Sequence, residues 1–208
     1  MTATPSPPGA AALLHDRNFS LYIVSRFIVA MSQRTLTVVL GYQIYDLTND
    51  AVSLGYVGLA SFLPTLVLLL PSGEIADRYD RRLVLLTSQA LLIGCSALFV
   101  ALSLAHVTVA WPYYAAMAVF GASNSLYRPS SLSTLVTVIG RERLITGFLV
   151  HASVVRIGVI VGPIVGGVMY ALGPASVYGA IMALYACSFA LDRKSTRLNS
   201  SHTDISRM

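Results

Sequence analysis

Two long stretches without a charged side chain constrain the fold of this chain more than any other feature. Residues 51–72 and 83–127 contain no Asp, Glu, Lys or Arg, and the segment between them reads GEIADRYDRR. A helix crosses the roughly 30 Å hydrocarbon core of a bilayer with about 20 predominantly apolar residues. The chain is 55% hydrophobic and 11% charged, against roughly 25% charged residues in soluble domains. We therefore expect an all-α integral membrane protein.

Six segments of the chain are long and apolar enough to be transmembrane helices. They are roughly residues 19–45, 52–72, 83–105, 109–127, 146–170 and 175–191. We expect one transmembrane domain over residues 19–192, preceded by a disordered cytoplasmic leader at 1–18 that lacks the basic start of a signal peptide. After Asp192 the apolar sequence gives way to a Ser-, Thr- and Arg-rich tract. Residues 193–208 are therefore interpreted as a non-native tail, with a natural cytosolic linker as the alternative.

The connections between these segments alternate in charge, which predicts the orientation of the chain. Residues 73–82 and 128–143 carry three Arg each, and Arg17 lies in the leader. The connections without Lys or Arg are residues 46–51, 105–109 and 171–176. Cytoplasmic loops are the ones enriched in Lys and Arg. We therefore expect both termini in the cytoplasm, as an even number of spans also requires.

Composition argues against several other classes of protein. The net charge is +5, but residues 193–208 contribute most of it and Lys194 is the only Lys. Basicity therefore gives no reason to expect a nucleic-acid partner. Cys95 and Cys187 lie inside apolar segments, with no Cys-x-x-Cys or Cys/His spacing in the sequence. We expect no metal site, no catalytic residue and no bound cofactor.

The charge cluster between the second and third segments matches a specific pattern. Its residues are Gly73, Asp77, Arg78, Arg81 and Arg82. This pattern resembles the loop 2–3 signature of the major facilitator superfamily, with Asp80 in place of the usual second Gly. The resemblance implies that Asp77 caps a helix in the other half of the protein and latches a cytoplasmic gate, since a helix N-terminus stabilises a carboxylate. The alternative is a topology anchor, for which the three Arg alone suffice.

The fifth segment contains a second pattern, GVIVGPIVGG at residues 158–167. Its motif positions are Gly158, Gly162, Pro163, Gly166 and Gly167. It resembles the fifth-span motif of antiporters and exporters in the same superfamily. Glycines four residues apart share one helix face and let another backbone approach closely, while Pro163 removes a backbone donor and is expected to kink the helix. A generic small-residue packing seam is the alternative.

Together with YDLTND and RPSSLSTLV, these motifs resemble the bacterial exporter branch that includes enterobactin and macrolide efflux proteins. The resemblance implies a twelve-span fold of two halves, each a 3+3 inverted repeat. This chain would be the N-terminal half, truncated before the second. The implied protein is a multi-pass transporter of the bacterial inner membrane that exports small organic molecules, of drug or siderophore type, by alternating access. Its energy source would be an ion gradient of protons, and its partners the bilayer, a small-molecule substrate and the missing C-terminal half. The fourth segment lacks the Arg-Gln-Gly sequence common in drug antiporters, so the antiporter interpretation rests on the fifth-span motif.

Polar and ionisable side chains inside a span are costly and are therefore candidates for contact with cargo. The candidate cavity-lining residues are Arg26, Gln33, Arg34, Asn124 and Arg156. Arg34 lies near the centre of the first segment, where a buried structural partner is the alternative. Arg26 lies nearer the cytoplasm, where snorkelling to the interface is the expected role. All acids up to residue 192 lie in loops or at span ends, so buried Arg side chains favour an anionic or oxygen-rich cargo.

Two other functions remain open on the sequence alone. The chain could be a six-span fragment or scaffold that packs without transporting. It could also be a membrane-embedded hydrolase with Ser123 as nucleophile and His151 as base, although the sequence lacks the turn that exposes such a serine. His151 is otherwise expected to be a structural histidine.

Overall fold

The computed structural model describes residues 13, 15–139 and 143–205, and within these ranges it is helical without a β-strand. Its helices are α2 (Arg17–Thr48), α3 (Ala51–Val67), α4 (Leu69–Arg78), α5 (Arg81–Leu104), α6 (Trp111–Ile139), α7 (Leu144–Tyr170) and α8 (Pro174–Ile205). The all-α expectation is confirmed. Most of the predicted leader lies outside the described residues.

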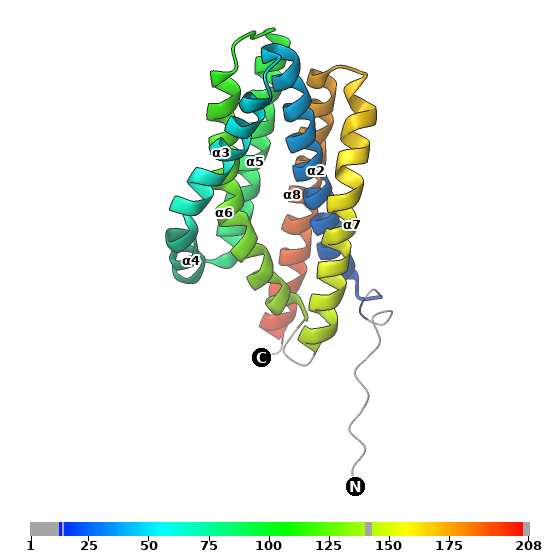
Figure 1. Cartoon of the computed structure of the whole chain (residues 1–208). Coiled ribbons are helices and arrows are strands. Elements are labelled where there is room, and N and C mark those ends of the chain that lie inside the picture. The colour runs from blue at the N-terminus through cyan, green and yellow to red at the C-terminus, as the bar shows by residue number, and fades with distance from the viewer. Residues whose placement is uncertain (1–12, 14, 140–142, 206–208) are drawn as a thin grey trace.

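The helices form an up-and-down bundle in which successive long helices alternate in direction, and α3 leads into the short α4 before the chain turns back into α5 (Figure 1). The α2/α3, α5/α6 and α7/α8 connections lie at one end. The α4/α5 connection, the end of α6 and the beginning of α7 lie at the other end, together with the beginning of α2 and the end of α8. Arg78 at the end of α4 and Arg143 before α7 therefore lie at the same end of the bundle as the beginning of α2 and the end of α8.

Short polar sequences explain where the first two long helices begin and end. The Asp16 side chain accepts a hydrogen bond from the backbone N–H of Asn18 at 2.9 Å and caps α2. Asn49 closes α2 in the left-handed conformation, at φ 50°. Asp50 then caps α3 by accepting from the N–H groups of Val52 and Ser53 at 3.0 and 3.2 Å. Such caps satisfy N–H groups that have no partner inside the helix.

Two expected loops are largely helical, which corrects the sequence-based boundaries. Residues 73–78 continue α4, so the turn before α5 is confined to Tyr79 and Asp80. Arg128 lies within α6, which continues to Ile139, although residues 128–143 were expected to be a connection. Charged residues end an apolar run without ending a helix, because Arg, Glu, Ala and Leu are all good helix formers. Similarly, α8 runs beyond residue 192 to Ile205, and the domain boundary at 192 stays a prediction.

Within the described residues, four helices are long and apolar enough to cross a membrane: α2, Leu83–Leu104 of α5, α7, and Pro174–Lys194 of α8. The α3 helix is apolar but shorter, with 17 residues, which corresponds to about 26 Å. Transmembrane crossing by α3 and α6 therefore stays a prediction. Large apolar side chains are exposed on the outside of the bundle, including Leu70, Ile145 and Val168, which are 85, 81 and 72% exposed. This apolar exterior suits lipid as the surrounding solvent.

The helices pack in a regular pattern of pairs. The α2 helix packs on α7 and α8, α6 packs on α3 and α5, and α5 packs on α8. Near the end of α5 and the beginning of α6, Phe99 stacks between Tyr113 and Tyr178, with its ring centroid 6.5 and 5.2 Å from theirs. Gln43 joins the same cluster, donating to the Tyr113 hydroxyl and accepting from that of Tyr178. These contacts matter because packing and interhelical hydrogen bonds, rather than hydrophobic burial, associate helices in lipid.

Candidate functional site

A buried ion pair links the first and last helices of the bundle. Arg26 on α2 pairs with Asp192 on α8, and the two side chains are 1 and 2% exposed. One guanidinium nitrogen of Arg26 also donates to the Tyr127 hydroxyl at 2.6 Å and to Ser131 Oγ at 3.0 Å, both on α6. Gln89 on α5 donates to the same Asp192 oxygen as Arg26. The pair therefore connects α2, α5, α6 and α8.

This pair overturns two expectations. Arg26 was expected to snorkel to the interface, but it is buried and bonded, with its guanidinium carbon 4.7 Å from the centroid of the Tyr22 ring. Asp192 was expected to lie at a span end, with no acid buried beside the Arg side chains, yet its carboxylate is buried and paired with Arg26. An Arg deep in a span requires a counter-charge or hydrogen-bond partners, but a sequence does not show which of several distant acids supplies it.

Next to the ion pair lies a cavity of about 470 Å³ between α2, α6 and α7, here named the arginine cavity. Its lining includes Arg26, Gln33, Arg34, Arg128, His151 and Arg156. The Arg34, Arg128 and Arg156 side chains are exposed, whereas Arg26 is buried in the ion pair. The structure therefore brings four of the five predicted cargo candidates to one cavity, and contact with cargo stays a prediction for each.

A second cavity of about 330 Å³ lies between α2, α3 and α6, and we name it the amide cavity. It is lined by Asn124, the fifth candidate, and shares Gln33, Arg34 and Arg128 with the arginine cavity. Gln33 donates a hydrogen bond to Asn124 across the two helices. Arg128 was not among the sequence candidates, because it was placed in a loop. Arg128 lines both cavities because α6 continues as a helix through that position.

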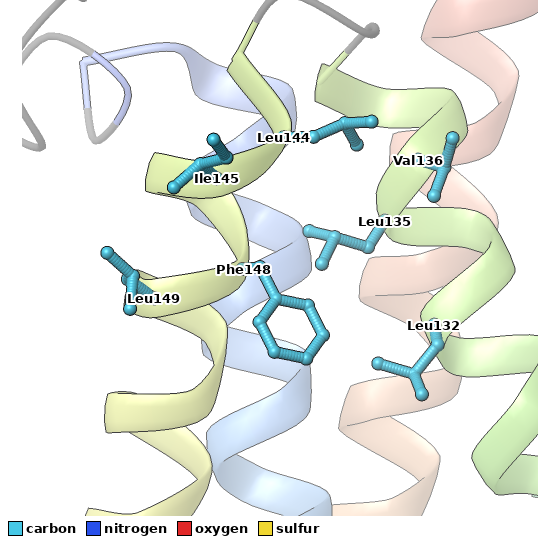
Figure 2. Close-up of a pocket in the computed structure, with 7 residues that line it drawn as sticks. All are labelled: Leu132, Leu135, Val136, Leu144, Ile145, Phe148 and Leu149. Carbon is cyan, nitrogen blue, oxygen red and sulfur yellow. The ribbon is translucent and has the colours of Figure 1, made fainter.

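A third cavity, about 430 Å³, lies between the end of α6 and the beginning of α7, and we name it the apolar cavity (Figure 2). Its seven lining residues are all apolar: Leu132, Leu135, Val136, Leu144, Ile145, Phe148 and Leu149. Leu132 also lines the arginine cavity. The ring of Phe148 lies 6.5 Å from that of His151, which belongs to the arginine cavity. The polar and apolar cavities therefore adjoin.

The glycine face of α7 packs directly on the backbone of α2. Gly158, Gly162 and Gly166 are buried. A Cβ on Gly162 would lie 2.6 Å from the carbonyl oxygen of Met31 and 2.7 Å from Arg34 Cβ. Thr35 Oγ1 donates to the Gly162 carbonyl at 2.9 Å. The close approach expected of these glycines is confirmed, and it places Arg34 beside the motif.

The remaining motif positions fall outside this seam. A Cβ on Gly167 would meet no atom within 4 Å, and α7 continues as a helix through Pro163.

In the charge cluster at residues 73–82, a Cβ on Gly73 would also meet no atom within 4 Å, and Arg78 is exposed beside Glu74 and Tyr79. The side chains of Asp77, Arg81 and Arg82 lie outside the described residues. The gate and exporter roles of the two motifs stay predictions.

The contacts of Ser123 and His151 do not form a nucleophile and base. Ser123 Oγ donates to the Val119 carbonyl of its own helix at 2.8 Å. His151 Nδ1 lies 3.3 Å from the Tyr22 hydroxyl, and the two rings stack. In the part of the chain that the structure describes, no group of His, Cys, Asp and Glu side chains is placed to hold a metal ion.

Comparison with known proteins gives a family and a set of relatives. The Major Facilitator Superfamily model matches residues 22–202 of the chain. The Enterobactin exporter EntS of Citrobacter koseri is 26% identical over 159 residues, which cover 74% of this chain and 37% of that protein. The protein of the same name from Shigella flexneri is also 26% identical over 159 residues, covering 74% of this chain and 38% of its own length. The aligned part of the chain thus corresponds to less than half the length of these relatives.

Proposed function

The chain belongs to the Major Facilitator Superfamily, and from that premise we propose that it forms the N-terminal six-span half of a secondary active exporter of small organic molecules. The observation that carries the proposal is the arginine cavity, which gathers four Arg side chains from α2, α6 and α7. Substrate sites in secondary transporters lie near the middle of the membrane, at the interface of structural repeats. The export direction follows from the name of the relatives.

The pairing of helices supports a 3+3 repeat within this half. Suppose that α2, α3 and α5 form one repeat and α6, α7 and α8 the other, so that α2 corresponds to α6, α3 to α7 and α5 to α8. Exchanging the two repeats then turns the α2–α7 contact into the α6–α3 contact. The same exchange turns α2–α8 into α6–α5 and maps α5–α8 onto itself. All of these pairs are present in the bundle. Corresponding helices such as α2 and α6 run in opposite directions (Figure 1), as inverted repeats require.

Similar hydrogen bonds join the close helix pairs of the two proposed repeats. Where α7 meets α2, Thr35 donates to the carbonyl of Gly162. Where α6 meets α3, Thr65 donates to the carbonyl of Gly121 at 3.0 Å. A Cβ on Gly121 would collide with the backbone carbonyl of Ser61. Both crossings thus combine a small residue with an interhelical hydrogen bond, which is how helices approach closely in lipid.

We place the end of the bundle that holds the beginning of α2 and the end of α8 in the cytoplasm of a bacterial cell, in a multi-pass inner-membrane protein. This placement follows from the Arg residues that flank the α4/α5 turn, from Arg143 before α7 and from the positive-inside rule. Alternating access then requires a second half that covers the cavities. In that arrangement Asp77 latches the cytoplasmic gate, the α7 glycine face orders the first span, and a proton gradient drives transport.

Reconstitution in liposomes tests this function, with enterobactin as the first cargo because the relatives carry its name. The complete protein should show saturable transport that stops when an ionophore collapses the proton gradient. The 208-residue chain alone should show none, since one half offers no alternating access. Flux through the chain alone would refute the need for a second half. A complete protein without gradient-dependent flux would favour the alternative, a non-transporting membrane scaffold.

A further inference from the structure

The three cavities adjoin one another and form one continuous surface with two kinds of lining. Gln33, Arg34 and Arg128 are shared between the arginine and amide cavities, and Leu132 is shared between the arginine and apolar cavities. Each cavity has a volume of 330–470 Å³, within the range of roughly 300–1,000 Å³ of small-molecule sites. A ligand at their junction would contact guanidinium groups on one side and aliphatic and aromatic carbon on the other.

The charged side of this surface is entirely cationic. The linings of the three cavities include four Arg and no Asp or Glu. Asp192, which contacts the lining residue Arg26, is engaged in the ion pair with it. In the part of the chain that the structure describes, no ion pair involves Arg34, Arg128 or Arg156. These three side chains therefore present their charge to the cavities.

Two of these charges, Arg34 and Arg156, lie in helices that are long and apolar enough to cross a membrane, and they require compensation there. Arg34 and Arg156 lie near the middle of α2 and α7, where a lone Arg costs at least about 2.5–3.5 kcal/mol on insertion scales. An anionic ligand supplies the missing counter-charge, and the planar guanidinium binds carboxylate, sulfonate or phosphate oxygens in pairs. The apolar cavity, which exposes only carbon side chains (Figure 2), suits an apolar or aromatic body on the same molecule.

We propose that this surface binds an amphipathic organic anion, with its charged group on Arg34, Arg128 and Arg156 and its apolar body against Leu132 and Phe148. The proposal rests on the proposed transport function, because it names the substrate class of the same cavity. It also predicts that the surface selects ligands by charge, binding an anion more tightly than neutral or cationic molecules of equal size.

The test is equilibrium binding to the 208-residue chain in phosphatidylcholine nanodiscs. The probes are naphthalenesulfonate, naphthalenemethanol and trimethyl(naphthylmethyl)ammonium, which share one apolar body and differ in charge. The anion should bind at least about tenfold more tightly than the neutral probe, since hydrogen bonds to charged groups contribute that much. The cation should bind most weakly. Equal affinities, or a preference for the cation, would overturn the proposal.

Variants locate the site. Arg34→Gln or Arg128→Gln should weaken binding of the sulfonate about tenfold and leave the neutral probe unchanged, while Arg34→Lys should restore part of the loss. Leu132→Gln should weaken all three probes. The matched control is Arg17→Gln, which removes an exposed charge outside the cavities and should change nothing. Equal loss in the Arg17 variant would mean that net charge, rather than a site, selects the anion. Circular dichroism of each variant excludes misfolding as the cause.

Two further comparisons separate the possible occupants and functions. Nanodiscs containing phosphatidylglycerol should still bind the sulfonate; complete competition by that lipid would make the lipid the occupant and overturn the assignment to cargo. Selective binding by the chain without flux in the complete protein would retain the ligand class and refute the transport proposal. Preferential flux of the cationic probe over the anion would retain the transport proposal and refute the anionic ligand class.

Discussion

Asp192→Asn is expected to destabilise the bundle strongly. The substitution keeps the shape of the side chain and removes its charge, which leaves the Arg26 guanidinium buried without a counter-charge. Tyr127 and Ser131 would still accept hydrogen bonds from Arg26, but both are neutral. The affected contacts join α2 and α8 and reach α5 and α6, so the whole bundle should respond.

The expected loss in the free energy of unfolding comes from the unpaired charge that the substitution leaves buried. Removing one partner of a buried ion pair typically destabilises a protein by about 3–5 kcal/mol, because the other charge remains desolvated. Arg26→Gln should cause a similar loss, since it strands the carboxylate instead. The double variant removes both charges and should be much more stable than the sum of the two single effects predicts. That difference is the coupling free energy of a double-mutant cycle.

The assay is denaturant unfolding in detergent micelles, followed by far-ultraviolet circular dichroism. The matched control is Asp50→Asn, because Asp50 is exposed and Asn caps a helix about as well as Asp. It should leave the free energy of unfolding unchanged. A loss below about 1 kcal/mol for Asp192→Asn, or additive effects in the double variant, would refute the account of the ion pair.

Three other expectations concern packing, gating and orientation. Gly162→Ala should lower the free energy of unfolding by about 1–3 kcal/mol, because its Cβ would press on the α2 backbone. Gly167→Ala, whose Cβ would face open space, should raise it by about 0.5–1 kcal/mol, as expected for Ala in place of Gly inside a helix. An equal loss of stability in both variants would disprove the seam. In the complete protein, Asp77→Asn should raise the labelling of cavity cysteines from the cytoplasmic side. The reason is that a carboxylate at a helix N-terminus would stabilise the closed gate by up to about 2 kcal/mol. Unchanged labelling and unchanged turnover would mean that the charge cluster is only a topology anchor. In a background without Cys95 and Cys187, an impermeant thiol reagent should label Val109→Cys in cells whose inner membrane is intact and Tyr79→Cys only after lysis, and the opposite pattern would reverse the assigned orientation.

Sequence patterns predicted the positions of most helices well, because over most of the chain the apolar segments and the helices coincide. The expected spans at 83–105 and 146–170 coincide closely with α5 and α7. The errors occurred where the apolar segments and the helices do not coincide. Arg128 and the polar residues after it end the apolar run, yet the backbone continues as a helix to Ile139. A boundary drawn from hydropathy therefore placed a cavity residue in a loop.

The candidate site was predictable in composition but not in pairing. Arg34, Gln33 and Asn124 stood out because polar side chains inside a span are rare, and all three line cavities. The partnership of Arg26 with Asp192 joins residues 166 positions apart. It depends on how the first and last helices pack, which no local pattern records. Arg26 was therefore misassigned to the interface, although its polarity marked it correctly as unusual.

The central claim is that the cavity between α2, α6 and α7 is the path of the cargo, and Arg34 tests it most directly. The measurement is export per molecule by the complete protein in proteoliposomes, normalised to the amount of folded transporter. Arg34→Ala should retain normal abundance and lose most of its export, whereas Arg17→Ala should retain both. Reduced abundance with normal export per molecule would contradict the claim and make Arg34 a structural residue.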